Sequence, residues 1–84
     1  MPTHDEIQQV WEKGKVVRGK NPNLYRKDDL GNEIYRPSYG KETPMGWEID
    51  HKKPKSKGGS DSMRNKRPLQ SGANARKSDK YPHK

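Results

Sequence analysis

The sequence predicts a small α+β domain in which residues 1–84 form a single unit. Three observations favour this class: a short amphipathic helix pattern near the N-terminus, a β-hairpin pattern after it, and a strand, loop, strand and helix order in the second half. Only 24% of the residues are hydrophobic and 36% are charged, so the core must be thin. We expect residues 1–46 to form the helix and the hairpin as support, and residues 47–80 to carry the chemistry.

The N-terminal helix is predicted by the segment PTHDEIQQVWEKGK. Thr3 and Glu6 have the spacing of a capping box, and an apolar stripe recurs at helical spacing through Ile7, Val10 and Trp11. In a chain with so few apolar residues, such a stripe is expected to build the core.

A β-hairpin is predicted after this helix, where LYRK and EIYR are separated by the turn sequence DDLGN. Aromatic and β-branched side chains favour strands, and a short glycine-containing loop is typical of a hairpin connection. We expect the hairpin to pack through four side chains, which are Leu24, Tyr25, Ile34 and Tyr35.

The second half predicts a strand, a long loop, a returning strand and a weak helix. The segment GWEIDHK is the first strand, whose alternation places Trp47 and Ile49 on one face and Glu48 and Asp50 on the other. PKSKGGSDSMRN is a loop by composition, KRPLQ is the returning strand, and SGANARKSDK is the helix, with Ser71 as its expected cap.

Charge is divided unevenly along the chain. Residues 1–50 carry eight Lys and Arg against nine Asp and Glu, whereas residues 51–84 carry eleven against two. A compact basic segment indicates a face that binds a polyanion, of which nucleic acid is the commonest in a cell. Charge alone leaves open the alternative of a solvated basic surface.

The composition also argues against several classes of protein. There is no run of about 18 apolar residues that could span a membrane and no signal-peptide pattern, so we expect an intracellular chain without a membrane partner. Because the sequence has no cysteine, neither a disulfide nor a thiolate zinc site can form.

The predicted order of elements would bring together three polar side chains that are distant in sequence. Asp50 at the end of a strand and Asn74 on the helix offer hard oxygen ligands, which suit Mg²⁺ or Mn²⁺. His51 follows Asp50 and, as a neutral imidazole, can accept a proton from water. These residue types suit metal-assisted hydrolysis of a phosphodiester.

The order and spacing of these residues resemble the motif of the HNH endonucleases, the ββα-metal nucleases. The resemblance covers about residues 47–80, with an Asp-His pair, a proline, a glycine pair, Asn65 fourteen residues after His51, and Asn74 nine residues later. It implies that His51 is the general base and that Asn65 holds the loop that positions it. It also implies that Asp50 and Asn74 bind the divalent metal.

The chain departs from the family pattern in two ways. Asn74 stands where the last motif position is often His, and two positions that hold zinc-binding Cys in many members are Gln70 and Ala73 here. We therefore expect no structural zinc, and we expect the N-terminal helix and the hairpin to replace its stabilising effect by packing on Trp47 and Leu69.

The basic side chains around the motif are expected to contact DNA phosphates, which gives affinity with little sequence specificity. They are Lys53, Lys55, Lys57, Arg64, Lys66, Arg67, Arg76 and Lys77, with Lys52 beside them. The resemblance implies a cytoplasmic, bacterial or phage-encoded endonuclease that hydrolyses double-stranded DNA. One active centre in each chain predicts a nick in one strand by a monomer or weak dimer.

Two alternatives remain open from the sequence. A non-catalytic DNA-binding module could share the fold, and DNA binding without cleavage or metal would support it. A nuclease that targets RNA is the second alternative, because metal-assisted hydrolysis needs no 2′-hydroxyl but tolerates one.

Overall fold

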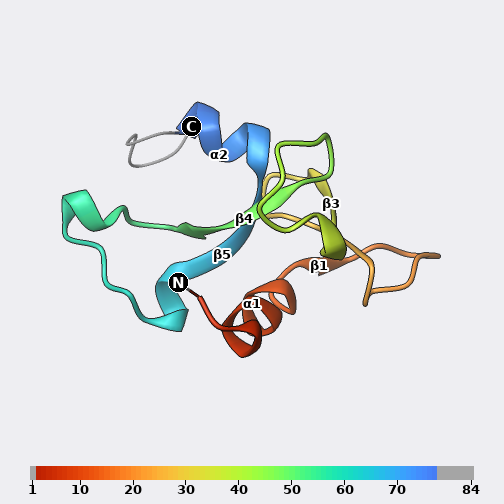
Figure 1. Ribbon diagram of the computed structural model, residues 1–84, viewed down its shortest axis with the longest axis horizontal. Helices are drawn as coiled ribbons and strands as arrows, with labels where there is room; N and C mark the ends of the chain where they lie inside the picture. Colours follow the sequence, from red (N-terminus) through yellow and green to blue (C-terminus); the bar gives the residue numbers. More distant parts are fainter. Residues whose placement is uncertain (1, 78–84) are drawn as a thin grey trace.

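The computed structural model describes residues 2–77, which form two α-helices and two antiparallel sheets (Figure 1). The elements are α1 (His4–Trp11), β1 (Lys15–Val16), β2 (Tyr25–Lys27), β3 (Glu33–Tyr35), β4 (Trp47–His51), β5 (Lys66–Gln70) and α2 (Ser71–Lys77). Short 3₁₀ turns lie in the connections at Arg36–Ser38, Lys55–Lys57 and Met63–Asn65. No helix within the described residues is long and apolar enough to cross a membrane. The predicted α+β class is confirmed.

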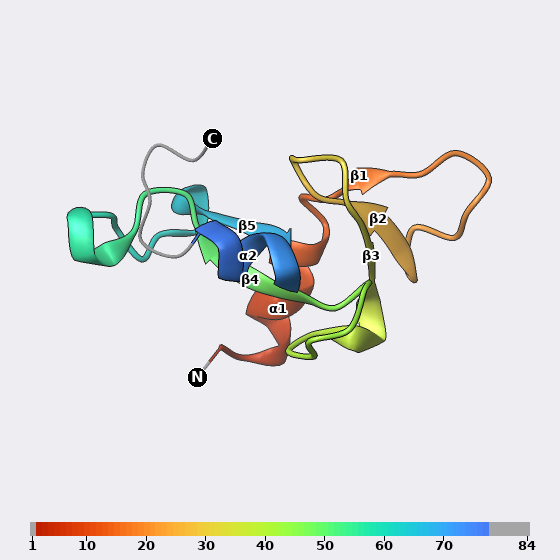
Figure 2. The same ribbon diagram turned by 90° about the horizontal axis from the view of Figure 1, so that it is seen from above.

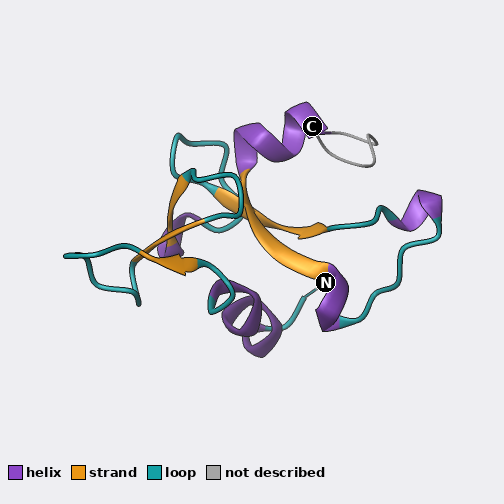
Figure 3. Cartoon of the chain, turned by 180° about the vertical axis from the view of Figure 1, so that it is seen from behind, coloured by secondary structure: helices purple, strands orange, loops and turns teal. Residues whose placement is uncertain are grey.

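Strands β4 and β5 form an antiparallel hairpin that lies between the two helices, with α2 on one side and α1 on the other (Figures 1 and 3). The strand register pairs Trp47 with Gln70 and His51 with Lys66. A long connection joins the two strands, and α2 follows β5 directly. This is the strand, loop, strand and helix order that the sequence predicts, and it places the end of β4 beside α2.

The predicted N-terminal hairpin is formed by β2 and β3, which pair Tyr25 with Tyr35. The rings of these two residues lie 5.0 Å apart between their centroids, and Ile34 is fully buried. Leu24 does not pack as expected, since 37% of it is exposed. The hairpin therefore packs through three of its four predicted side chains.

A third strand, β1, pairs with β2 and completes the N-terminal sheet. This strand could not be predicted from the sequence pattern, because β1 has two residues and both are exposed. This sheet and the β4–β5 connection lie at opposite ends of the molecule, whose longest dimension is 38 Å (Figure 2).

The core is one small cluster built from both halves of the sequence. Val10 and Trp11 from α1, Ile34 from β3 and Trp47 from β4 are all fully buried. The indole rings of Trp11 and Trp47 lie 5.2 Å apart, and the Trp11 Nε1–H donates to the carbonyl of Pro22 at 3.0 Å. Of the two residues on which the N-terminal helix and hairpin were predicted to pack, Trp47 lies in this cluster, and Leu69 is also fully buried.

The predicted cap is correct at α1 and wrong at α2. At α1, the Glu6 backbone N–H donates to Thr3 Oγ1 at 3.1 Å. At α2, Ser71 lies inside the helix and its hydroxyl donates to a backbone carbonyl in the connection before β4. The side-chain oxygen of Gln70 instead accepts the Ala73 backbone N–H at 2.8 Å, and this bond satisfies one of the free donors at the helix start.

Candidate active site

Three predicted site residues line one hollow between the end of β4 and α2. Asp50 and His51 reach it from β4, and Asn74 reaches it from α2. The hollow has a volume of about 350 Å³ and is also lined by Pro54 and Lys77. The structure therefore brings together the Asp, His and Asn that lie far apart in the motif.

Asp50 is a buried carboxylate held by two cations. Only 5% of it is exposed, and its Oδ1 and Oδ2 accept hydrogen bonds from Lys77 Nζ at 2.7 Å and Arg67 Nε at 2.9 Å. Lys77, itself 2% exposed, also donates to the carbonyl of His51 at 2.7 Å. Because a buried charge is tolerated only when it is paired, these contacts neutralise Asp50 and fix the end of β4 against α2.

Asn74 is oriented by a carboxylate on the neighbouring strand. Its Nδ2 donates to Glu48 Oε1 at 2.7 Å, and within residues 2–77 its Oδ1 accepts no hydrogen bond. Glu48 and Asp50 both contact α2, whereas Ile49 packs against the core cluster. This confirms the predicted alternation of β4 and leaves the Asn74 amide oxygen available as a ligand.

Asn65 holds the long connection between β4 and β5 in one shape. Its Nδ2 donates to the carbonyls of Lys53 at 3.0 Å and Ser60 at 2.7 Å, and its Oδ1 accepts the Lys53 N–H at 3.0 Å. Gly59 allows the close approach, because a Cβ there would lie 1.8 Å from the Lys53 carbonyl oxygen. These contacts are the ones expected of a residue that holds the loop next to the histidine.

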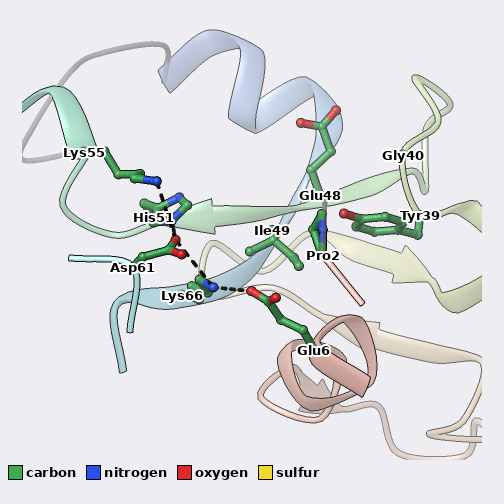
Figure 4. Close-up of a pocket in the computed structure, with 10 residues that line it drawn as sticks. All are labelled: Pro2, Glu6, Tyr39, Gly40, Glu48, Ile49, His51, Lys55, Asp61 and Lys66. Atoms are coloured by element: carbon green, nitrogen blue, oxygen red, sulfur yellow. Dashed lines mark hydrogen bonds and ion pairs between the residues drawn. The ribbon is translucent and has the colours of Figure 1, made fainter. Parts of the chain in front are cut away.

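The His51 ring contacts an acidic residue of the same connection. His51 Nε2 lies 2.8 Å from Asp61 Oδ1 (Figure 4). The hydrogen bond to His51 lowers the pKa of Asp61, and the nearby charges of Lys55 and Lys66 lower it further. Asp61 is therefore an anion at neutral pH, and it can only accept a hydrogen bond from the imidazole.

A line of polar contacts continues from Asp61 to α1. Asp61 Oδ1 lies 3.5 Å from Lys66 Nζ, and Lys66 also pairs with Glu6 of α1 (Figure 4). The hydrogen bond to Glu6 raises the pKa of Lys66 against the opposing effect of burial. These residues and His51 border a second hollow of about 490 Å³ on the side of β4 that faces α1.

The oxygen donors at the first hollow fit a hard divalent cation in kind. A carboxylate has about four acceptor positions, of which the two hydrogen bonds to Asp50 use two. The Asn74 amide oxygen is the second donor, and waters usually complete the coordination of such ions. Within residues 2–77 no three His, Cys, Asp or Glu side chains converge in a metal-ligand cluster, so a divalent ion in this hollow would depend on the amide oxygen.

The residues predicted to bind nucleic acid fall into two groups. The exposed group consists of Lys53, Lys55, Lys57, Arg64 and Arg76, with Lys52 beside them. The other three, Lys66, Arg67 and Lys77, are withdrawn from the surface in ion pairs with acidic side chains. While these pairs hold, the phosphate contacts expected of Lys66, Arg67 and Lys77 are not available.

Sequence reasoning missed two acidic residues that orient the site, Glu48 and Asp61. Asp61 is one of only two acidic residues after position 50, and this isolation in a basic segment could have singled it out. Glu48 gave no comparable signal, because an acidic residue on the polar face of a strand is common.

Comparison with protein families gives one finding. The sequence model of the HNH endonuclease family matches residues 42–83, half of the chain, and the match contains Asp50, His51, Asn65 and Asn74. Comparisons with curated proteins and with solved structures give no significant match. The family indicates nuclease activity on nucleic acid, and three of these four motif residues, Asp50, His51 and Asn74, line the hollow beside α2. The chain belongs to the HNH endonuclease family.

Proposed function

We propose that the chain is a divalent-metal-dependent DNA endonuclease that hydrolyses phosphodiester bonds and nicks one strand with weak sequence specificity. The observation that carries the proposal is that Asp50, His51 and Asn74 line one hollow at the end of β4. Membership of the HNH endonuclease family supports the reaction class. DNA as the substrate, a divalent metal as the cofactor and cleavage of one strand go beyond what the family indicates.

His51 would act as the general base for the attacking water. An imidazole accepts a proton near neutral pH, and removal of that proton produces the hydroxide-like nucleophile that hydrolysis needs. The ring is 26% exposed, so water can reach it from the surface. Asn65 would act indirectly, because its hydrogen bonds hold the connection that follows His51.

Asp50 and Asn74 would hold the metal, and Mg²⁺ and Mn²⁺ are the ions that best suit their oxygen donors. When bound, the ion supplies positive charge that stabilises the phosphoryl oxygens and the leaving oxygen. Glu48 keeps the Asn74 amide oriented with its nitrogen on the carboxylate. Lys77 and Arg67 hold the Asp50 carboxylate in place through one hydrogen bond to each oxygen.

The exposed cations around the connection would supply the affinity for DNA. Phosphate contacts of this kind carry no sequence information and weaken steeply as salt displaces them. The candidates are Lys52, Lys53, Lys55, Lys57, Arg64 and Arg76. One catalytic hollow in a monomer would cut one strand, and a double-strand break would require a dimer or two encounters.

Cleavage of supercoiled plasmid tests the proposal. With Mg²⁺ or Mn²⁺ the chain should convert the plasmid to open circles, and chelator should prevent the conversion. His51→Ala should slow the reaction by roughly 10²-fold or more, because a positioned general base contributes about that factor. The variant should still retard DNA on a gel.

His4→Ala is the matched control, since His4 is exposed on α1, and it should cut at the wild-type rate. Equal rates for His51→Ala and the wild type would assign the base to another residue.

A second function, a DNA-binding module without catalysis, is favoured by one observation. Both oxygens of Asp50 already bind a cation from the chain itself, which reduces the attraction for a metal ion. If this function is correct, the plasmid will be retarded on a gel but will stay supercoiled with every metal. A parallel assay on single-stranded RNA and DNA separates the RNA-targeting alternative, which would be supported by cleavage of RNA at least as fast as DNA.

A further inference from the structure

We propose that Asp61 is a positioning residue for His51, which holds the imidazole proton on Nε2 and leaves Nδ1 as the atom that accepts the proton of water. The proposal rests on the proposed function only where it gives His51 the role of base. The tautomer of His51 that it describes is a property of the protein without bound DNA or metal.

The contact itself fixes the tautomer. His51 Nε2 lies 2.8 Å from Asp61 Oδ1, a normal hydrogen-bond distance. An ionised carboxylate has no proton to donate, so the imidazole nitrogen must be the donor. A neutral imidazole carries one N–H, and the other nitrogen then has a free lone pair. Within residues 2–77, no hydrogen bond is made to His51 Nδ1.

The carboxylate is held on the ring from several sides. Lys66 Nζ and Lys55 Nζ lie 3.5 Å and 3.8 Å from Asp61 Oδ1, and Lys66 is in turn anchored on Glu6 of α1 (Figure 4). The preceding residue is also fixed, because the Asn65 side chain donates to the carbonyl of Ser60. Asp61 is thus placed by the connection and by α1, and not by His51 alone.

The exposure of the Asp61 side chain distinguishes a role in positioning His51 from a role in stabilising the fold. The side chain of Asp61 is 63% exposed, and exposed ion pairs contribute little to folding stability. Loss of the carboxylate should therefore leave the fold intact while it frees the ring to exchange its proton between Nε2 and Nδ1. The expected effect lies in turnover, with little change in stability or in DNA affinity.

Asp61→Asn is the main test, because the amide keeps the shape of the side chain but can donate to Nε2 and favour the wrong tautomer. We expect kcat for plasmid nicking to fall by roughly 10- to 100-fold, as for other residues that orient a reacting group, with KM for DNA unchanged. Asp61→Glu should restore part of kcat, since it returns the acceptor. Asp5→Asn, on the exposed first turn of α1, is the matched control and should retain the wild-type kcat.

A spectroscopic measurement decides the tautomer without any turnover. In the ¹⁵N-labelled chain at about pH 8, the His51 nitrogens should show a proton on Nε2 and none on Nδ1. In Asp61→Asn the two tautomers should mix or invert, while exposed His4 serves as an internal reference in both proteins. A proton on Nδ1 in the wild type, or the same tautomer in both proteins, would overturn the proposal.

The two measurements separate failure of this proposal from failure of the proposed function. If the wild type cuts and Asp61→Asn cuts equally fast, the positioning role falls and the nuclease stands. If the wild type cuts neither DNA nor RNA with any metal, the nuclease falls, and the nitrogen signals still decide whether Asp61 sets the tautomer of His51.

Discussion

At the scale of single residues, the site consists of motif side chains and the partners that fix them. The Asp, His and Asn of the motif could be predicted from type and spacing, because each has a chemistry that suits phosphodiester hydrolysis. Their partners Glu48, Asp61 and Lys77 could not be predicted in those roles. Each of these contacts joins residues at least ten positions apart and depends on how β4, its connection and α2 pack.

Lys77→Met should tighten the binding of Mn²⁺. The Lys77 ammonium lies 2.7 Å from Asp50 Oδ1, so it would compete with the proposed divalent ion for the same carboxylate. Removal of one unit charge at this distance should lower the Kd by roughly tenfold or more, given charge interactions of about 4 kcal/mol at 4 Å near a protein surface. Titration calorimetry measures the change directly.

Arg76→Met is the control for this titration, because Arg76 is exposed on the same helix and makes no contact with Asp50. Asn74→Ala should weaken binding, since it removes the amide oxygen from the hollow. An unchanged Kd in both Lys77→Met and Asn74→Ala would place the metal away from this hollow.

At the scale of elements, the periodicity of apolar residues predicted the longer elements and failed to predict the short ones. The helix α1 follows the helical spacing and the strand β4 the alternation that the sequence displays. β1 was missed because two exposed residues carry no alternation. Ser71 was wrong as a cap because its hydroxyl bonds to a carbonyl thirty residues away, which leaves Gln70 to fold back on the helix start.

The connection between β4 and β5 gives a test at this scale. Asn65→Ala removes three hydrogen bonds that hold it, so the loop should loosen while the rest of the fold persists. We expect the Lys53 amide, which donates to Asn65 Oδ1, to lose its protection in hydrogen exchange, and plasmid nicking to slow by roughly 10-fold or more. Ser62→Ala in the same loop is the control. Retained protection at Lys53 would argue against this role of Asn65.

At the scale of the whole molecule, the two halves depend on each other. Residues 1–46 and 47–77 contribute to one apolar cluster, so we expect neither half to fold alone. Asp28 makes a second link, because this fully buried carboxylate in the β2–β3 turn accepts the Gln70 backbone N–H at 2.9 Å. Sequence reasoning foresaw packing on Trp47 from the position of the apolar residues, but it had no means of foreseeing a polar link between the turn and β5.

Asp28→Ala should destabilise the whole fold. It leaves the backbone N–H groups of Leu30, Asn32 and Gln70 without their acceptor at partly buried positions, where a donor left unpaired costs up to about 1–3 kcal/mol. A total loss of roughly 2–5 kcal/mol is a large part of the stability of a domain of this size. Urea unfolding measures it, with Asp29→Ala as the control because the Asp29 side chain is 46% exposed. An equal midpoint for the two variants would show that the link is unimportant.

The contact between Trp11 and Trp47 gives the protein a built-in optical reporter. These are the only two tryptophans in the sequence, both are fully buried, and they come from α1 and β4. Their fluorescence therefore arises entirely at the junction between the supporting half and the half that holds His51. A red shift of the emission would signal that water has reached this junction, so the joining of the two halves during folding can be followed in the natural chain without an attached dye.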